Sequence, residues 1–212
     1  MLRYPKVLSY AIGCACLKAC VYGLYFWLPT FLSLKGEEID EQKGYISAMM
    51  EYGSIIGAFI LGFLVDRYNK RSLLLSPLLL TSSILMCLIS FFVREPWEYY
   101  VAIFILGITL IGPYNIMSTV ITLDLSKSIK EKNSITKISS LIEGISVFVS
   151  AGFMIVIPHI PFHLLFYVFA SECLIAVIIL WSPFYEELTK IESLKYYFTN
   201  PNRVGNDGSR EI

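Results

Sequence analysis

Charged residues are scarce in this sequence. Only 16% of its 212 residues are charged, whereas 56% are hydrophobic, and the mean hydropathy is +0.63. A water-soluble domain needs a more polar surface than this, so the composition predicts that lipid is the solvent. Lysine plus arginine equals aspartate plus glutamate, at 17 each. With no basic excess, we expect no nucleic-acid partner.

The common motifs of catalysis and of metal or nucleotide binding are also missing. The sequence has no Walker A loop, no H-E-x-x-H pair and no C-x-x-C pair. Its five cysteines, at positions 14, 16, 20, 87 and 173, lie inside apolar stretches, and we interpret them as small core residues. We therefore expect that the protein is not an enzyme and holds no cofactor or metal ion.

Six long apolar segments dominate the chain. A bilayer core takes about 20 consecutive apolar residues per helix, and segments near 7–33, 44–65, 72–93, 97–123, 138–158 and 162–184 meet that length. We predict an all-α membrane protein with a six-helix transmembrane domain at 1–184. Residues 185–212 form a polar cytoplasmic tail that we expect to be largely disordered. Within it, residues 187–198 are either an amphipathic surface helix or an extension of the last helix.

Basic residues are distributed unequally between the two ends of the predicted helices. Only Lys35, Lys43 and Arg94 flank the helices on one side. The other side holds thirteen cations: Arg3, Lys6, Arg67, Lys70, Arg71, Lys127, Lys130, Lys132, Lys137, Lys190, Lys195, Arg203 and Arg210. Because short cytoplasmic loops of membrane proteins are enriched in lysine and arginine, we expect both termini to face the cytoplasm.

The turn between the second and third spans carries a charged motif. Residues 62–71 fit G-x-x-x-D-R-x-x-[K/R]-R, with Gly62, Asp66, Arg67, Lys70 and Arg71 at the specified positions. Gly62 is expected to let a neighbouring helix approach, while Asp66 can accept hydrogen bonds from arginine side chains or from backbone N–H groups. Such a cluster can hold one conformation and release it, so we predict a conformational switch.

Small residues and a proline mark two further helix positions. Gly53 and Gly57 form a small-x-x-x-small ridge that predicts close helix packing. Gly112 and Pro113 interrupt the fourth span near its middle, and we predict a hinge there. Each feature alone also fits ordinary membrane packing with a static kink. Together with the 62–71 loop, they favour alternating access.

The 62–71 loop resembles the signature loop of the major facilitator superfamily, in the position it takes in the second half of those transporters. Further stretches are KACVYGLYFWLPTFL at 18–32, EYGSIIG at 51–57, and GPYN at 112–115 with DL at 124–125. They resemble the organophosphate:phosphate antiporters, and among these the sugar-phosphate exchangers of solute carrier family 37. The resemblance covers roughly residues 8–184. It implies a secondary transporter that exchanges a sugar phosphate for inorganic phosphate, in the endoplasmic reticulum membrane rather than the plasma membrane.

Four ionisable side chains lie within the predicted spans: Lys18, Glu51, Glu143 and Glu172. Each costs about 2.5–3.5 kcal/mol at mid-bilayer unless it faces protein or water, so a functional role is the first hypothesis. Lys18 is the best candidate, because an ammonium in a low-dielectric cavity suits a phosphate dianion. The alternative is a structural lysine that snorkels or pairs with a glutamate. Glu143 and Glu172 are not assigned, since each can be placed near a bilayer edge.

The predicted substrate site gathers around Lys18. Tyr22 and Tyr25 follow it at i+4 and i+7, on one helix face. Glu51 and Tyr52, near the middle of the second span, bring a carboxylate and a hydroxyl to the same cavity. Glu51 either contacts substrate or pairs with Lys18 in the empty site. The tyrosines either bind substrate or pack as ordinary aromatic residues.

The resemblance also implies that these six spans are one half of a twelve-helix bundle. We therefore expect a small phosphorylated substrate, inorganic phosphate, membrane lipid, and either a missing N-terminal half or a second chain as partners. The alternative, from a different class, is a non-transporting regulatory or assembly subunit that keeps the half-fold.

Overall fold

The computed structural model describes residues 5–68, 71–115 and 134–199, and within these ranges every regular element is helical. In chain order the elements are α1 (Pro5–Ser33), α2 (Glu37–Tyr68), α3 (Arg71–Phe91), α4 (Pro96–Leu106), the π-helical turn η1 (Gly107–Ile111), α6 (Ser134–Val156), the 3-10 turn η2 (Ile157–His159) and α7 (Phe162–Thr199). The predicted all-α class is confirmed.

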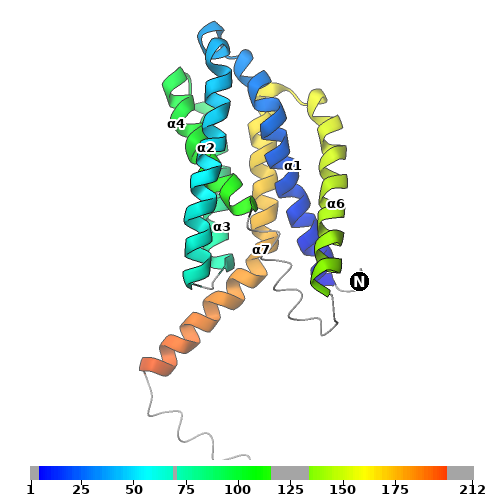
Figure 1. Cartoon of the computed structure of the whole chain (residues 1–212), viewed down its shortest axis with the longest axis vertical. Coiled ribbons are helices and arrows are strands. Elements are labelled where there is room, and N and C mark those ends of the chain that lie inside the picture. The colour runs from blue at the N-terminus through cyan, green and yellow to red at the C-terminus, as the bar shows by residue number, and fades with distance from the viewer. Residues whose placement is uncertain (1–4, 69–70, 116–133, 200–212) are drawn as a thin grey trace, which may run out of the picture.

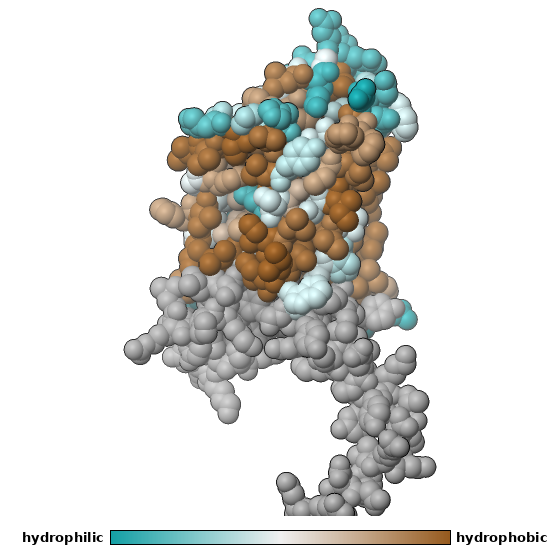
Figure 2. Space-filling model, turned by 180° about the vertical axis from the view of Figure 1, so that it is seen from behind, coloured by the Kyte–Doolittle hydropathy of each residue, from teal (hydrophilic) through white to brown (hydrophobic). Residues whose placement is uncertain are grey.

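Six helical segments in the described ranges are long and apolar enough to cross a membrane. They are Ala11–Ser33, Glu37–Val65, Leu74–Phe91, Pro96–Asn115, Ser139–His159 and Phe162–Ile179. Large apolar side chains point outward from them: Phe148 is 83% exposed and Phe59 is 81% exposed. Figure 2 shows the result as a broad hydrophobic band below a polar rim. An apolar surface of this extent fits lipid rather than water, so the chain is a multi-pass membrane protein.

Two helices extend beyond their predicted spans. α2 begins at Glu37 rather than near residue 44, because Glu37, Glu38 and Asp40 in its first turn favour the positive end of the helix dipole. Gly36, at φ +145°, makes the turn that precedes it. α7 continues to Thr199, well past residue 184, where the sequence predicts that a largely disordered tail begins. Figure 1 shows this extension leaving the bundle, as the helix-extension alternative predicts.

Successive described helices run in opposite directions through the bundle (Figure 1). α1 contacts α2, α6 and α7, while α3 packs on α7 and α2 packs on α4 and η1. The core between them is apolar, and its largest fully buried side chains include Tyr99, Phe166 and Phe169. The described start of α1 lies at the same end of the bundle as the end of α2 and the start of α3 (Figure 1). α6 packs mainly on α1, so the other described helices leave much of its surface uncovered.

α2 approaches α4 and η1 closely, backbone against backbone. A Cβ atom built on Gly53 would lie 3.1 Å from the Cα of Gly107, and one on Gly57 would lie 2.7 Å from the carbonyl oxygen of Ile108. The predicted glycine ridge is therefore confirmed as a packing surface. On the facing segment, the N–H of Gly112 donates to the carbonyl of Gly107, five residues back, as a π-helical turn requires.

The 62–71 loop is described only in part. α2 ends at Tyr68 and α3 begins at Arg71, whereas residues 69–70 and the side chains of Asp66, Lys70 and Arg71 lie outside the described part. Arg67 is exposed. No described atom lies within 4 Å of the position that a Cβ on Gly62 would occupy, so the helix approach expected at this residue stays a prediction. The close approach in the described part of α2 is made at Gly57 and Gly53, which lie about one and a half and two and a half turns earlier.

Candidate functional site

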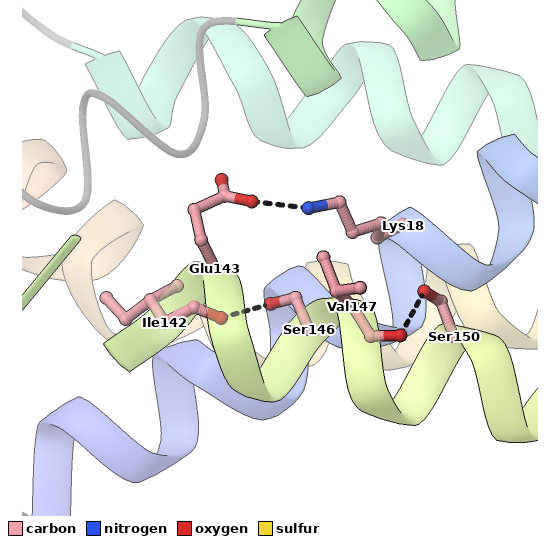
Figure 3. Close-up of polar contacts among 6 residues, drawn as sticks. All are labelled: Lys18, Ile142, Glu143, Ser146, Val147 and Ser150. Atoms are coloured by element: carbon pink, nitrogen blue, oxygen red, sulfur yellow. Dashed lines mark hydrogen bonds and ion pairs between the residues drawn. The ribbon is translucent and has the colours of Figure 1, made fainter. Parts of the chain in front are cut away.

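Lys18 is buried in the interior of the first span. It lies on α1 with only 4% of its surface exposed. Its ammonium forms an ion pair with the carboxylate of Glu143 on α6. Figure 3 shows the two side chains reaching toward each other from facing helices. A buried ammonium in a low-dielectric setting requires such a counter-ion, because an unpaired charge there is strongly destabilising.

The two members of this ion pair differ in exposure. The side chain of Lys18 is 6% exposed, whereas that of Glu143 is 43% exposed. Two hydroxyls that follow Glu143 on α6 are bonded to their own helix: Ser146 donates to the carbonyl of Ile142 at 2.6 Å, and Ser150 to that of Val147 at 3.0 Å (Figure 3). Among the described residues, Lys18 is therefore the hydrogen-bonding partner that holds the Glu143 carboxylate.

Aromatic hydroxyls lie beside the ion pair. The Lys18 ammonium is 5.9 Å from the centroid of the Tyr22 ring, within cation–π range. Tyr114, which follows η1, lies next to Tyr22 and within electrostatic range of Glu143. Residues of α1, α6 and the segment after η1 thus surround one buried charge.

A second polar contact joins α1 to α2. The hydroxyl of Tyr25 donates to the carboxylate of Glu51 at 3.4 Å. The next turn of α2 contributes Ser54, whose hydroxyl donates to the backbone carbonyl of Glu51 at 2.8 Å. Tyr25 is seven residues beyond Lys18, which is about 10 Å along the axis of α1. The two polar contacts are therefore separated by two helical turns.

The structure brings most of the predicted substrate residues together, with a different pairing. Glu51 meets Tyr25, so the alternative in which it pairs with Lys18 is wrong for this conformation. Tyr52 is 58% exposed and makes no hydrogen bond or ring contact with another described residue. Whether any of these residues binds substrate stays a prediction.

Glu143 is one of the two glutamates that the sequence leaves unassigned. One signal points to it: a lone cation within a span needs a carboxylate partner, and only Glu51, Glu143 and Glu172 lie away from the ends of the predicted spans. Choosing among them requires knowing that α6 packs on α1, which hydropathy does not reveal.

Glu172 is not part of the polar cluster described above, which consists of Lys18, Tyr22, Tyr25, Glu51, Tyr114 and Glu143. It lies in the interior of the Phe162–Ile179 span rather than at its edge, and only 9% of its surface is exposed. Its Oε2 atom is buried without a hydrogen-bond partner among the described residues. Its electrostatic neighbours include Cys16 and Cys20 on α1.

The cluster has the groups to bind an anion with attached hydroxyls. It offers one ammonium, tyrosine hydroxyls and the carboxylates of Glu51 and Glu143. Glu143 pairs with Lys18, whereas Glu51 accepts from Tyr25. Within the described ranges, no three His, Cys, Asp or Glu side chains gather in a way that would hold a metal ion.

The family model of the Major Facilitator Superfamily matches residues 1–151 and, in a second overlapping match, residues 40–195. The chain belongs to the major facilitator superfamily. Its six antiparallel spans are the all-α half-fold of that superfamily, as the loop at 62–71 indicates.

Several superfamily members with curated functions are similar to this chain. It is 28% identical to the mouse (Mus musculus) protein named glucose-6-phosphate exchanger SLC37A1 over 148 residues, which is 68% of this chain and 28% of the relative. It is 31% identical to sugar phosphate exchanger 3 of Bos taurus over 128 residues, 58% of this chain and 25% of the relative. A longer match, 23% identity over 194 residues, covers 88% of this chain and 39% of mouse glucose-6-phosphate exchanger SLC37A2. The predicted resemblance to sugar-phosphate exchangers is confirmed, and the chain spans less than two fifths of each of these relatives.

Proposed function

We propose that this protein is a secondary active transporter that exchanges a sugar phosphate or related organic phosphate for inorganic phosphate by alternating access. The observation that carries the proposal is Lys18, a buried cation within a span whose counter-ion is the more exposed member of the pair. An ammonium at this depth gives a phosphate dianion a strong charge-assisted contact. The similarity to proteins named sugar-phosphate exchangers supports this substrate class.

The two polar contacts on α1 provide a way to orient such a substrate. The phosphate group would bind at Lys18, beside Tyr22. The sugar hydroxyls would bind two turns further along, at Tyr25 and Glu51, where a hydroxyl and a carboxylate offer a donor and acceptors. The separation of about 10 Å along the helix is comparable with the length of a phosphorylated hexose.

The cavity would be shared between two six-helix halves. The chain matches 39% or less of the length of each of the three relatives named above. In transporters built from two repeats, the substrate lies at the interface between them near the bilayer midplane. We propose that a second six-helix half, on the same polypeptide or on another chain, completes the site and supplies further cations.

The same transport cycle gives roles to the loop and the helix interruption. The 62–71 loop would latch one conformation through its charges, and the segment at Gly112 and Pro113 would bend as the halves rock. The unequal distribution of lysine and arginine supports cytoplasmic termini. We propose the endoplasmic reticulum membrane as the location, on the resemblance to solute carrier family 37 alone.

Counterflow in proteoliposomes tests this function. The full-length gene product is reconstituted into vesicles loaded with inorganic phosphate, and uptake of labelled glucose 6-phosphate is measured. The control vesicles contain chloride in place of phosphate. Uptake that requires internal phosphate is the expected result. A folded protein that shows no uptake in either case would favour a different substrate or the non-transporting subunit.

A further inference from the structure

Glu143 is the member of the Lys18–Glu143 ion pair that is exposed at the surface of the described residues. Lys18 is 6% exposed at its side chain and Glu143 is 43% exposed, so an approaching anion meets Glu143 before it reaches the ammonium. We propose, resting on the transport function above, that Glu143 is a tethered competitor: it neutralises Lys18 in the empty carrier and is displaced by the phosphate group of the substrate.

The carboxylate is free to leave. Ser146 and Ser150, which follow Glu143 on α6, donate to backbone carbonyls of their own helix rather than to Glu143. At the adjacent Gly144, no described atom lies within 4 Å of the position that a Cβ would occupy. Among the described residues, the ammonium is thus the main restraint on Glu143, and none of them blocks its side chain on the side of Gly144.

Simultaneous binding of both anions is disfavoured by charge. A carboxylate and a phosphate dianion that contact the same ammonium lie within a few ångströms of each other, and their repulsion is strong where the dielectric is low. One cation cannot offset both. In the described ranges Lys18 pairs with Glu143, Cys14 and Tyr114 lie within electrostatic range of it, and Tyr22 lies beside the pair, so Lys18 is the one cation among these groups. Phosphate therefore replaces Glu143 rather than joining it.

Displacement has a measurable signature that a purely structural ion pair lacks. Removing the competing carboxylate leaves Lys18 without a counter-ion, so the empty protein becomes less stable. The same change lets phosphate bind without first displacing a carboxylate, so the phosphate affinity rises. A structural ion pair predicts the loss of stability and no gain in affinity.

The test is a thermal-unfolding titration of the purified full-length gene product with inorganic phosphate. The variants are Glu143→Gln, the double variant Lys18→Gln with Glu143→Gln, and Glu172→Gln as a control that removes a different buried carboxyl from the same membrane domain. For Glu143→Gln we expect a melting temperature below that of the wild type without phosphate and a larger rise when phosphate is added. Half-maximal stabilisation should need at most about one fifth of the phosphate concentration that the wild type needs. We expect the double variant to lose the response and Glu172→Gln to match the wild type.

The remaining outcomes distinguish failure of the competitor role of Glu143 from failure of the transport function. If the wild type responds to phosphate and Glu143→Gln responds equally or less, the competitor role is wrong while the transport function stands. If neither phosphate nor glucose 6-phosphate stabilises the wild type, the proposed function and this inference both fail. Should Glu143→Gln not fold, Glu143→Asp takes its place, because the shorter side chain weakens the pair while keeping the charge. An affinity for phosphate no higher than that of the wild type would then overturn the proposal.

Discussion

Gly53 on α2 and Gly107 on η1 are in direct backbone contact. A Cβ on Gly53 would lie 3.1 Å from the Cα of Gly107, and a Cβ on Gly107 would lie 3.1 Å from the Cα of Gly53. Neither position has room for a side chain, because the nearest atoms belong to the facing backbone, which cannot turn aside as a side chain would. Such contacts hold membrane helices together by dispersion, since lipid supplies no hydrophobic driving force between them.

This contact predicts that Gly53→Ala weakens the fold. Forcing the two backbones apart should destabilise the protein by about 1–3 kcal/mol. Gly44→Ala is the matched control in the same helix, because no described atom lies within 4 Å of its Cβ position. Alanine there should stabilise by about 0.5–1 kcal/mol through its higher helix propensity. Thermal unfolding in detergent compares the two variants, and equal melting temperatures would show that α2 and η1 do not meet at glycine.

A second prediction concerns the contact between Tyr25 and Glu51, at 3.4 Å. If these groups bind sugar hydroxyls, Tyr25→Phe and Glu51→Gln should each weaken sugar-phosphate binding by about 0.5–1.5 kcal/mol, the usual net value of a hydrogen bond. The KM for inorganic phosphate, which has no sugar, should change little.

The measurement is the KM of each ligand in phosphate self-exchange and in exchange with glucose 6-phosphate. Tyr45→Phe is a control on α2, since Tyr45 is 71% exposed and is not part of the cluster. Parallel increases in KM for both ligands would place Tyr25 and Glu51 at the phosphate group instead of the sugar.

A third prediction is that Glu172→Met stabilises the protein. The Oε2 atom of Glu172 is buried without a hydrogen-bond partner in the described ranges. An unsatisfied buried polar group costs about 1–3 kcal/mol, and methionine fills a similar volume without that desolvation penalty. The melting temperature in detergent should therefore rise. A marked fall would show that the carboxyl has a partner or a role in the native membrane domain.

How far the sequence determines this structure differs from feature to feature. The number and order of the spans follow from the apolar runs, because each helix in lipid must bury a full bilayer thickness. The Gly53 and Gly57 ridge follows from residue size. The start of α2 at Glu37 and the end of α7 at Thr199 do not follow from hydropathy, since a helix continues past the membrane wherever capping and propensity allow it.

The sequence is enough to predict which residue types form the site, but not which of their side chains pair with one another. Lys18 and the tyrosines at i+4 and i+7 are visible as a polar face on an otherwise apolar helix. The partner of Lys18 depends on which helix packs on α1, and in the structure that helix is α6, which carries Glu143. Tyr114 joins the cluster through the packing of a segment more than ninety positions away in the chain. Hydropathy along the chain contains no information about that arrangement.

The most direct test of the account is the initial rate of phosphate/glucose 6-phosphate counterflow for Lys18→Ala beside the wild type, at equal amounts of folded full-length protein. Lys43→Ala is the matched control, because Lys43 pairs with Asp40 on α2, away from the cluster. The account predicts that Lys18→Ala abolishes counterflow while Lys43→Ala retains it. Counterflow by Lys18→Ala at the wild-type rate and KM would contradict the claim that Lys18 binds the phosphate group.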